Sequence, residues 1–331
     1  MRIVRVGVDA MGGDRAPHAI VEGSRAAASE YVHPYLFGPS DVLEPIADGL
    51  TTRHASAVVG MEEKPTDAAR EKRESSLFVA CRSVGTGETD VVISAGNTGA
   101  MLAAALLEIG RLPGVARPGI AVPIPGRKGP WILIDAGANA DARPEHLVQF
   151  AHMGSIFAEE IVGLAKPSVG LLSIGEEPEK GNRLVLEAHG LLSAEDGVEF
   201  VGNVESRLLL EGPADVIVAD GFVGNMVLKM IEGTVRSTLE IVREEIAAST
   251  RGKVGGLLIR SAAQRVKQRF DPDIYGGAYL LGLNGLVVIA HGNSSPQAVT
   301  NAIDLGVRGV QANVVERLSE RFPARVPASA S

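Results

Sequence analysis

Five expected strands are each followed by glycine together with Asn, Asp or Ser. The loops are DAMGGD at 9–14, SAGNTG at 94–99, DAGAN at 135–139, DGFVGN at 220–225 and HGNSS at 291–295. Any one of them could be an ordinary turn, because turns favour these residue types. In open parallel sheets, however, ligands bind beyond the carboxyl ends of the strands. The repetition therefore predicts that the five loops converge on one edge of a sheet and form a binding site there.

Anion binding is the chemistry that these loops favour. Glycine allows backbone N–H groups to approach an anion closely, and a helix N-terminus behind them adds a favourable dipole. The segment SAGNTG, which leads into a helix expected at 98–110, has that arrangement. It matches neither the G-x-G-x-x-G dinucleotide fingerprint nor a P-loop, since its spacing differs and no GK[ST] follows. Phosphate or carboxylate binding is therefore favoured over NAD or ATP binding.

Two lysines and one histidine are the candidate charged groups beside these loops. Lys64 in MEEKPTD and Lys180 in GEEPEKGN follow strands, although either could be a solvated surface lysine. His291 follows an apolar strand, whereas His146 and His152 are six residues apart, which does not match the spacing of a metal-binding pair on one helix face. No G-x-S-x-G elbow occurs, so a serine acyl-enzyme has no support. The pattern favours direct displacement on an activated acyl group, with no covalent protein nucleophile and no metal.

The composition narrows the class of protein. A formal net charge of −8 argues against a nucleic-acid binder. Cys81 is the only cysteine, which excludes an internal disulfide and a zinc site built on several thiolates, and its apolar neighbours predict a buried side chain. The first residues contain no apolar signal-peptide core, and no run of about 18 apolar residues occurs. We therefore expect a cytoplasmic protein.

Short β-rich runs alternate with longer helical patterns along the chain. Strands are expected at residues 3–9, 35–37, 55–59, 90–94, 119–124, 131–135, 168–174, 199–202, 215–219 and 285–290. Helices are expected at 17–29, 66–84, 98–110, 144–164, 183–193 and 222–248, and from Ser295 to about Arg321. This alternation predicts a three-layer α/β/α sandwich with a mostly parallel sheet. One such domain is expected over 1–322, with a disordered, proline-broken tail at 323–331.

A projecting helical hairpin is expected over residues 226–270. Its first helix carries one apolar stripe, formed by Leu228, Ile231, Val235, Leu239, Val242 and Ile246. A glycine-rich tip, RGKVGGLLIR at 251–260, and a second helix to Phe270 follow. We expect the stripe to be buried against a second copy of the chain, and the alternative is a helix pair packed on its own core.

Taken together, the motifs resemble those of the phosphate acyltransferase family of bacterial phospholipid synthesis. The resemblance covers the chain from Arg2 to about Phe322, in order and with similar spacing. Besides the five loops it includes EEKPTDAARE at 62–71, GEEPEKGN at 175–182 and GGAYLLGLNGLVVIAHG at 276–292. Tyr279 and Asn293 depart from the usual family pattern.

The resemblance implies a fold, a reaction and partners. The fold would be similar to phosphotransacetylase and to the isocitrate and isopropylmalate dehydrogenases, assembled as a homodimer. The reaction would convert long-chain acyl-ACP and inorganic phosphate to acyl phosphate and free acyl carrier protein, without a cofactor. The product would pass to the membrane glycerol-3-phosphate acyltransferase. Alternatives are a phosphotransacetylase acting on acyl-CoA, or a non-catalytic sensor of acyl ligands at the membrane.

The reaction needs positioning and charge stabilisation more than a strong base. Phosphate is already ionised at neutral pH, and the oxyanion formed at the thioester carbonyl needs donors placed in advance. The residues expected to be catalytic are Lys180 and Asn182, which would neutralise phosphate or the oxyanion, His291 as a candidate proton carrier, and Asp9 and Asp14. The residues expected to contact substrate are Gly12, Gly13, Lys64, Ser94, Gly96, Asn97, Thr98, Asp135, Asn139, Asp220, Gly221 and Asn225.

The hairpin tip is positively charged, whereas the chain as a whole has a net charge of −8. From Ile246 to Phe270 there are six basic residues and no acidic one. Four apolar side chains lie between them, namely Val254, Leu257, Leu258 and Ile259. Because basic and apolar residues together favour an anionic lipid surface, we expect reversible contact with the inner face of the cell membrane. The alternative is a docking patch for acidic acyl carrier protein.

Overall fold

The computed structural model describes residues 2–270, 272–274 and 276–322, and the expected tail at 323–331 lies outside them. These residues form an 11-stranded sheet in the order β3-β2-β1-β4-β11-β10-β5-β6-β9-β7-β8. The strands are β1 (Val4–Asp9), β2 (Val32–Gly38), β3 (Thr51–His54), β4 (Val91–Ser94), β5 (Gly119–Pro125), β6 (Pro130–Ile134), β7 (Ser168–Ser173), β8 (Glu199–Glu205), β9 (Val216–Val218), β10 (Ala278–Leu281) and β11 (Leu286–Ile289).

The sheet consists of two parallel halves that run in opposite directions. One half contains β3, β2, β1, β4 and β11, and the other contains β6, β9, β7 and β8. Between them, β10 is antiparallel to β11 and to β5, and β5 is antiparallel to β6. Three successive antiparallel pairings reverse the strand direction.

This reversal corrects the predicted convergence of five loops on one edge. The loops after β1, β4 and β11 lie together at one edge, whereas those after β6 and β9 follow strands of the opposite direction. The physical reason is the strand β10, which was not expected. The expected strand at 55–59 was also misplaced, because β3 ends at His54 and Ala57 forms only an isolated bridge with Ser75.

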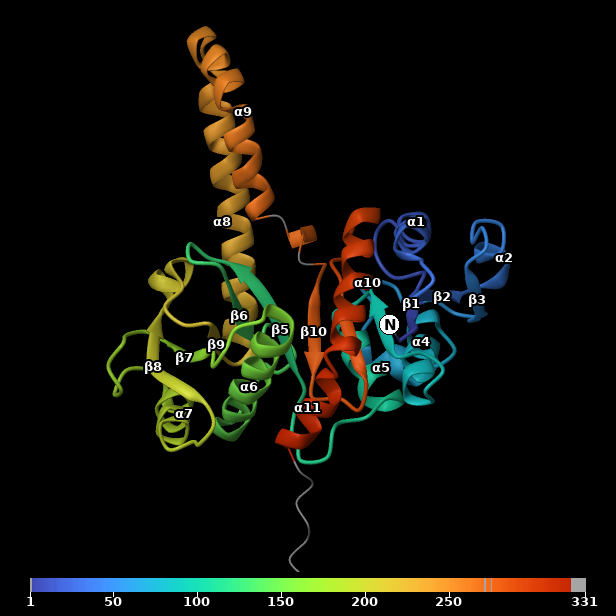
Figure 1. The fold of residues 1–331 in the computed structure, drawn as a ribbon, viewed down its shortest axis with the longest axis horizontal. Coiled ribbons are helices and arrows are strands. Elements are labelled where there is room, and N and C mark those ends of the chain that lie inside the picture. Colours follow the sequence, from blue (N-terminus) through green and yellow to red (C-terminus); the bar gives the residue numbers. More distant parts are fainter. Residues whose placement is uncertain (1, 271, 275, 323–331) are drawn as a thin grey trace, which may run out of the picture.

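Helices cover both faces of the sheet, which confirms the α/β/α architecture (Figure 1). One face packs against α1 (His18–Ala27), α6 (Pro144–Phe157), α7 (Arg183–Ser193), α10 (Pro296–Gln311) and α11 (Val314–Arg321). The other packs against α3 (Pro65–Glu71), α4 (Ser76–Gly85), α5 (Thr98–Glu108) and α8 (Gly221–Ala247). The short α2 (Ser40–Leu43) packs beside β3. Cys81 is fully buried on the second face, as predicted.

Three expected helices are interrupted. The helix expected at 66–84 is divided into α3 and α4, because the chain turns at residues 72–75. The helix expected at 144–164 ends as α6 and continues as a π-helix, Ala158–Val162. The last helix breaks before α11 at Asn313, whose φ of 53° is left-handed and cannot continue a right-handed helix.

Helices α8 and α9 (Thr250–Arg269) form the projecting hairpin, which rises away from the sheet in Figure 1. At 27 residues, α8 is about 40 Å long. Its residues that pack against the core lie in its first half, between Val223 and Ile231. The turn between the helices lies at residues 248–249, which corrects the predicted glycine-rich tip. The segment 251–260 is helical because Ser249 Oγ accepts the Gly252 N–H and starts α9.

The first turn of α8 lies against the loop that follows β6. Asp135 is fully buried there, and its carboxylate accepts the backbone N–H groups of Ile120, Gly137, Ala138 and Asn139 at 2.7–3.1 Å. A Cβ on Gly224 would overlap the carbonyl oxygen of Asp135. Glycine at this position therefore allows the helix backbone to approach the loop.

This close approach gives a paired prediction on one helix. Gly224→Ala should lower the thermal unfolding midpoint, because overpacking costs about 1–3 kcal/mol. Gly233→Ala should leave the midpoint unchanged or raise it, because a Cβ there meets no atom within 4 Å and alanine is favoured in a helix by about 0.5–1 kcal/mol. Thermal unfolding followed by circular dichroism decides, and equal shifts for both variants would contradict the packing described.

Candidate functional site

Three loops meet at the edge formed by β1, β4 and β11, and we call residues 9–14, 94–99 and 291–295 the glycine-loop cluster. The Asp14 N–H donates to the Gly292 carbonyl at 2.7 Å. Ser94 Oγ donates to Asp9 Oδ2 at 2.7 Å and accepts the Gly96 N–H at 3.0 Å. A Cβ on Gly12 would lie 2.6 Å from Asp9 Oδ2 and 2.8 Å from the Gly96 nitrogen. Glycine at position 12 therefore allows the first two loops to touch.

Asp9 is the buried carboxylate at the centre of this cluster. Its side chain is 3% exposed and also accepts the Met11 N–H. Burial raises the pKa of Asp9 above its ordinary value of 3.8, and the hydrogen bonds from Ser94 and Met11 only partly oppose that effect. Asp9 therefore joins the first two loops from behind rather than facing solvent.

The surface of the cluster presents unpaired backbone donors. In the part of the chain that the structure describes, the N–H groups of Gly13, Asn97, Thr98 and Gly99 have no hydrogen-bond acceptor. Three of them lie at the start of α5, where the helix dipole favours negative charge. This arrangement can bind an anionic oxygen group through the backbone.

The side chain of Asn97 is already engaged. Its Oδ1 accepts the Ala100 N–H at 3.0 Å, and its Nδ2 donates to the carbonyls of Met61 and Glu63 at 2.8 and 2.9 Å. Asn97 therefore caps α5 and attaches the loop that precedes α3. Lys64 is exposed at the end of that loop, and its ammonium makes no ion pair within the described residues.

His291 has a partner that the sequence did not suggest. Its Nε2 lies 3.9 Å from Oε1 of Glu232 on α8, and the two side chains are 39% and 36% exposed. Glu232 lies on a long helix whose polar residues resemble an ordinary solvated face. Only the fold shows that this helix passes the glycine-loop cluster.

A second group of predicted residues surrounds the loop after β6, and its polar side chains are mostly used within the loop. Asn139 Nδ2 donates to the Pro118 carbonyl and to Asp135 Oδ2, at 2.7 and 2.8 Å. Asp220 caps α8 by accepting two backbone N–H groups at 3.0 Å. Asn225 makes no side-chain hydrogen bond within the described residues. Asp135, Asn139 and Asp220 therefore position the loop, and Asn225 alone of these side chains is free for a ligand.

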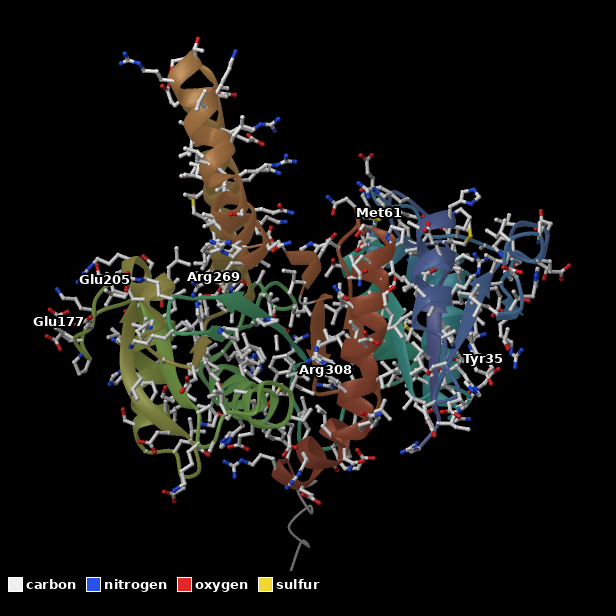
Figure 2. All side chains as sticks on the ribbon, turned by 45° about the horizontal axis from the view of Figure 1, so that its top comes forward. Tyr35, Met61, Glu177, Glu205, Arg269 and Arg308 are labelled. Atoms are coloured by element: carbon white, nitrogen blue, oxygen red, sulfur yellow. The ribbon has the colours of Figure 1, made fainter. Side chains whose placement is uncertain are left out.

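The loop that carries Lys180 is not part of the glycine-loop cluster. The backbone carbonyl of Lys180 accepts a hydrogen bond from Ser173 Oγ at 2.9 Å. Asn182 Oδ1 caps α7 by accepting the Val185 N–H at 3.0 Å. The Lys180 N–H donates to the carbonyl of Glu177, and Figure 2 shows Glu177 and Met61 on opposite sides of the hairpin base. Within one chain, the structure does not bring Lys180 and Asn182 to His291.

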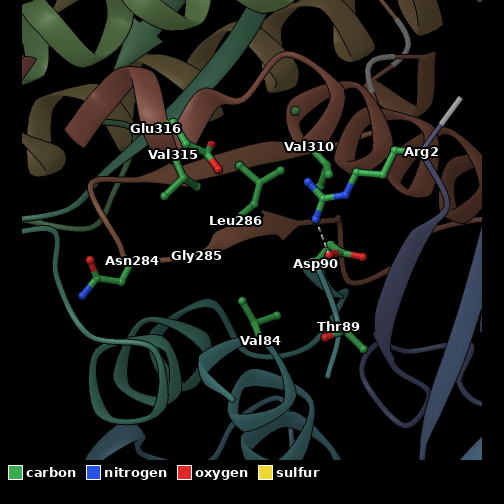
Figure 3. Close-up of a pocket in the computed structure, with 11 residues that line it drawn as sticks. Arg2, Val84, Thr89, Asp90, Asn284, Gly285, Leu286, Val310, Val315 and Glu316 are labelled. Atoms are coloured by element: carbon green, nitrogen blue, oxygen red, sulfur yellow. Dashed lines mark hydrogen bonds and ion pairs between the residues drawn. The ribbon is translucent and has the colours of Figure 1, made fainter. Parts of the chain in front are cut away.

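A pocket of about 140 Å³ lies at the amino ends of β4 and β11, opposite the glycine-loop cluster (Figure 3). Asp90 in its wall forms ion pairs with Arg2 and Arg5 at 2.9 and 3.0 Å. Although burial opposes ionisation, the hydrogen bonds and charge of Arg5 hold the pKa of Asp90 below its usual value. Arg2 and Arg5 thus form ion pairs with Asp90 within the chain. None of the predicted site residues lines the pocket.

Two further features concern metals and membranes. Among residues 2–270, 272–274 and 276–322, no three His, Cys, Asp or Glu side chains are arranged to hold a metal ion. Within the same residues, no helix combines the length and apolar character that crossing a bilayer requires.

The raised pKa of Asp9 predicts a pH-dependent effect of Asp9→Asn on stability. A carboxyl whose pKa is raised on folding contributes stability below its unfolded pKa and loses it as pH rises through the folded value. The unfolding midpoint of Asp9→Asn relative to the native chain should therefore increase as pH rises from about 3.8, the ordinary value. Thermal melts across pH, with Asp14→Asn as an exposed control, test this. A relative midpoint that falls with pH would mean that ionised Asp9 stabilises the fold.

Proteins of similar sequence show to which family this chain belongs. A family model described as "Fatty acid synthesis protein" matches residues 4–317. A phosphate acyltransferase of Heliobacterium modesticaldum is 45% identical, with 98% of this chain and 99% of the relative covered. The phosphate acyltransferase of Clostridium novyi is 41% identical, with 98% and 100% covered.

Solved structures share the fold at low sequence identity. A phosphotransacetylase of Streptococcus pyogenes has a TM-score of 0.61 at 15% identity, with 95% of this chain and 94% of that chain covered. A 4-hydroxythreonine-4-phosphate dehydrogenase of Klebsiella pneumoniae has a TM-score of 0.52 at 14% identity, with 94% and 99% covered. The resemblance seen in the motifs is thus confirmed over nearly the full length, and the chain belongs to the phosphate acyltransferase family of fatty acid synthesis enzymes.

Proposed function

We propose that this acyltransferase transfers the acyl group of long-chain acyl-ACP to inorganic phosphate, giving acyl phosphate and free acyl carrier protein. The observation that carries the proposal is the set of unpaired N–H groups at the start of α5, within the glycine-loop cluster. Such donors hold a phosphate dianion in place for attack on the thioester carbonyl. The leaving thiol has a pKa of about 8.5 by analogy with cysteine, so it needs little help from a general acid.

A phosphotransacetylase acting on acyl-CoA is the second candidate function. It is favoured by the shared fold with the phosphotransacetylase of Streptococcus pyogenes. The identity of 15% to that protein supports the fold alone, whereas the relatives above 40% identity are phosphate acyltransferases. Carrier-linked acyl groups are therefore our preferred substrates over acyl-CoA. A non-catalytic sensor of acyl ligands would bind acyl-ACP without forming a phosphate-dependent product.

Release of free acyl carrier protein from palmitoyl-ACP, measured with and without phosphate, tests the reaction. We expect release only with phosphate. Because the Lys180 loop lies apart from the glycine-loop cluster within one chain, a loss of about 100- to 1000-fold in Lys180→Ala, as for oxyanion-hole donors, would mean that Lys180 stabilises negative charge outside that cluster. A folded Lys180→Ala variant with normal turnover would assign Lys180 to the solvated surface. Turnover of acetyl-CoA without turnover of acyl-ACP would favour the second candidate.

A homodimer and a membrane location complete the proposal. Leu228 and Ile231 of the expected stripe pack against the core of the same chain. Another row on α8, formed by Phe222, Met226 and Met230, is 55–68% exposed and supports contact with a second copy. On α9, Val254, Leu257, Leu258 and Ile259 are 48–81% exposed among basic residues, which supports reversible contact with an anionic leaflet from the cytoplasm. Release of product there would supply the membrane glycerol-3-phosphate acyltransferase.

Leu258→Glu tests the membrane contact, with Gln264→Glu as a matched control on the same exposed helix. Both variants add one negative charge, but only the first removes an exposed apolar side chain. We expect phosphatidylglycerol vesicles to carry the native chain and Gln264→Glu upward on flotation, and to leave Leu258→Glu behind, with soluble turnover unchanged. If Leu258→Glu floats normally but has a raised KM for acyl-ACP, this part of α9 is a carrier-protein site.

A further inference from the structure

Helix α8 connects the two groups of predicted residues. Near its start, Asn225 lies against the loop after β6, since a Cβ on Gly137 would be 3.6 Å from the Asn225 Cβ. Seven residues later, Glu232 pairs with His291 at 3.9 Å. At a rise of 1.5 Å per residue, these two contacts are about 10 Å apart along the helix. One short strip of α8 therefore faces both groups of loops.

Lys229 lies on this strip, between the two contacts. It follows Asn225 by four residues and precedes Glu232 by three, and residues at those spacings are neighbours on one helix face. Its side chain is exposed, and within the described residues its ammonium has no hydrogen bond or ion pair. Glu232, the neighbouring carboxylate, contacts His291 and not Lys229.

The opposite face of α8 fixes the direction in which this strip points. Val223, Val227 and Ile231 pack against the core beneath the helix. The strip with Asn225, Lys229 and Glu232 lies outside that apolar row, so its side chains are open to solvent and to the loops. An unpaired ammonium thus lies on a helix that reaches the glycine-loop cluster at His291.

We propose that Lys229 binds the phosphate substrate, as the cation that complements the backbone donors at the start of α5. The proposal rests on the proposed function, in which phosphate occupies the glycine-loop cluster. An ammonium adds a charge-assisted hydrogen bond to the dianion, and such bonds are stronger than neutral ones. His291, whose Nε2 lies 3.9 Å from Glu232 Oε1, belongs to the same cluster. In this arrangement Lys229 adds a second positive charge to that of Lys64, whose loop Asn97 attaches to the start of α5, and it supplies within one chain the charge that Lys180 was expected to bring.

Arg243 provides a matched control. It lies eleven residues beyond Glu232, which is three helical turns and about 16 Å further toward the hairpin tip. It is exposed, on the same face and without an ion pair within the described residues. Replacing either residue removes one positive charge from α8, but only Lys229 lies next to the loops.

The experiment compares Lys229→Met, Lys229→Arg and Arg243→Met, each shown to be folded by circular dichroism. Binding of inorganic phosphate is measured by isothermal titration calorimetry, and KM is measured separately for phosphate and for palmitoyl-ACP. For Lys229→Met we expect the Kd and KM for phosphate to rise by about tenfold or more, as for loss of one charged hydrogen bond, with little change in the KM for palmitoyl-ACP. Lys229→Arg should recover most of the affinity, and Arg243→Met should match the native chain.

Each outcome separates this inference from the proposed function. If the native chain releases acyl carrier protein with phosphate but Lys229→Met binds phosphate normally, the assignment of Lys229 is wrong and the function stands. If phosphate binding depends on Lys229 but no acyl carrier protein is released, the site stands and the function is wrong. If the native chain binds no phosphate, both are wrong. Equal losses for Lys229→Met and Arg243→Met would also overturn the inference, since they would reflect the general charge of the helix.

Discussion

The reversal of strand direction at the centre of the sheet governs the arrangement of the rest of the molecule. Because β10 and β5 are antiparallel to their neighbours, the carboxyl ends of β1 and β6 point in opposite senses. Loops with the same glycine-rich pattern therefore belong to two different groups. A helix that runs past the sheet from one group to the other is needed to connect them, and α8 is that helix.

Close backbone approach brings the segments of both groups of loops into direct contact. In the glycine-loop cluster, Gly12 allows the loop after β1 to touch the loop after β4, with buried Asp9 behind them. In the other group, Gly224 allows α8 to lie against the loop after β6. The Asp135 carboxylate orders that loop by accepting its backbone N–H groups. Most of the polar side chains in these loops thus organise the backbone. Ligand contact is left to free N–H groups and to the few unpaired side chains, as suits a reaction that depends on positioning.

The sequence was informative where a feature depends on local pattern. The alternation of strands and helices predicted the sandwich, and three of the five glycine loops predicted to meet at one edge of the sheet do so, after β1, β4 and β11. It was not informative where pairing between distant strands decides the outcome. The four residues of β10 are all buried and show no period, so nothing in them indicates an antiparallel strand. Without that strand, one edge for all five loops was the natural expectation.

The roles of individual side chains were harder to predict than the loops themselves. Asn97 has the residue type of a phosphate ligand, but the fold uses its amide to cap α5 and to hold the loop of Met61. Lys229 and Glu232 have the pattern of a solvated helix face, and only the passage of α8 beside His291 distinguishes them. Spacing within one helix can be read from the sequence, but which loop that helix passes cannot.

An anomalous difference map would show whether the glycine-loop cluster and α8 form one anion site, as we propose. Crystals of the native chain would be soaked with arsenate, a phosphate analogue whose arsenic can be located by its anomalous scattering. We expect a peak within hydrogen-bond distance of the N–H groups of Thr98 and Gly99 and of the Lys229 ammonium. A peak at the Lys180 loop or in the pocket beside Asp90, with none at the start of α5, would contradict it.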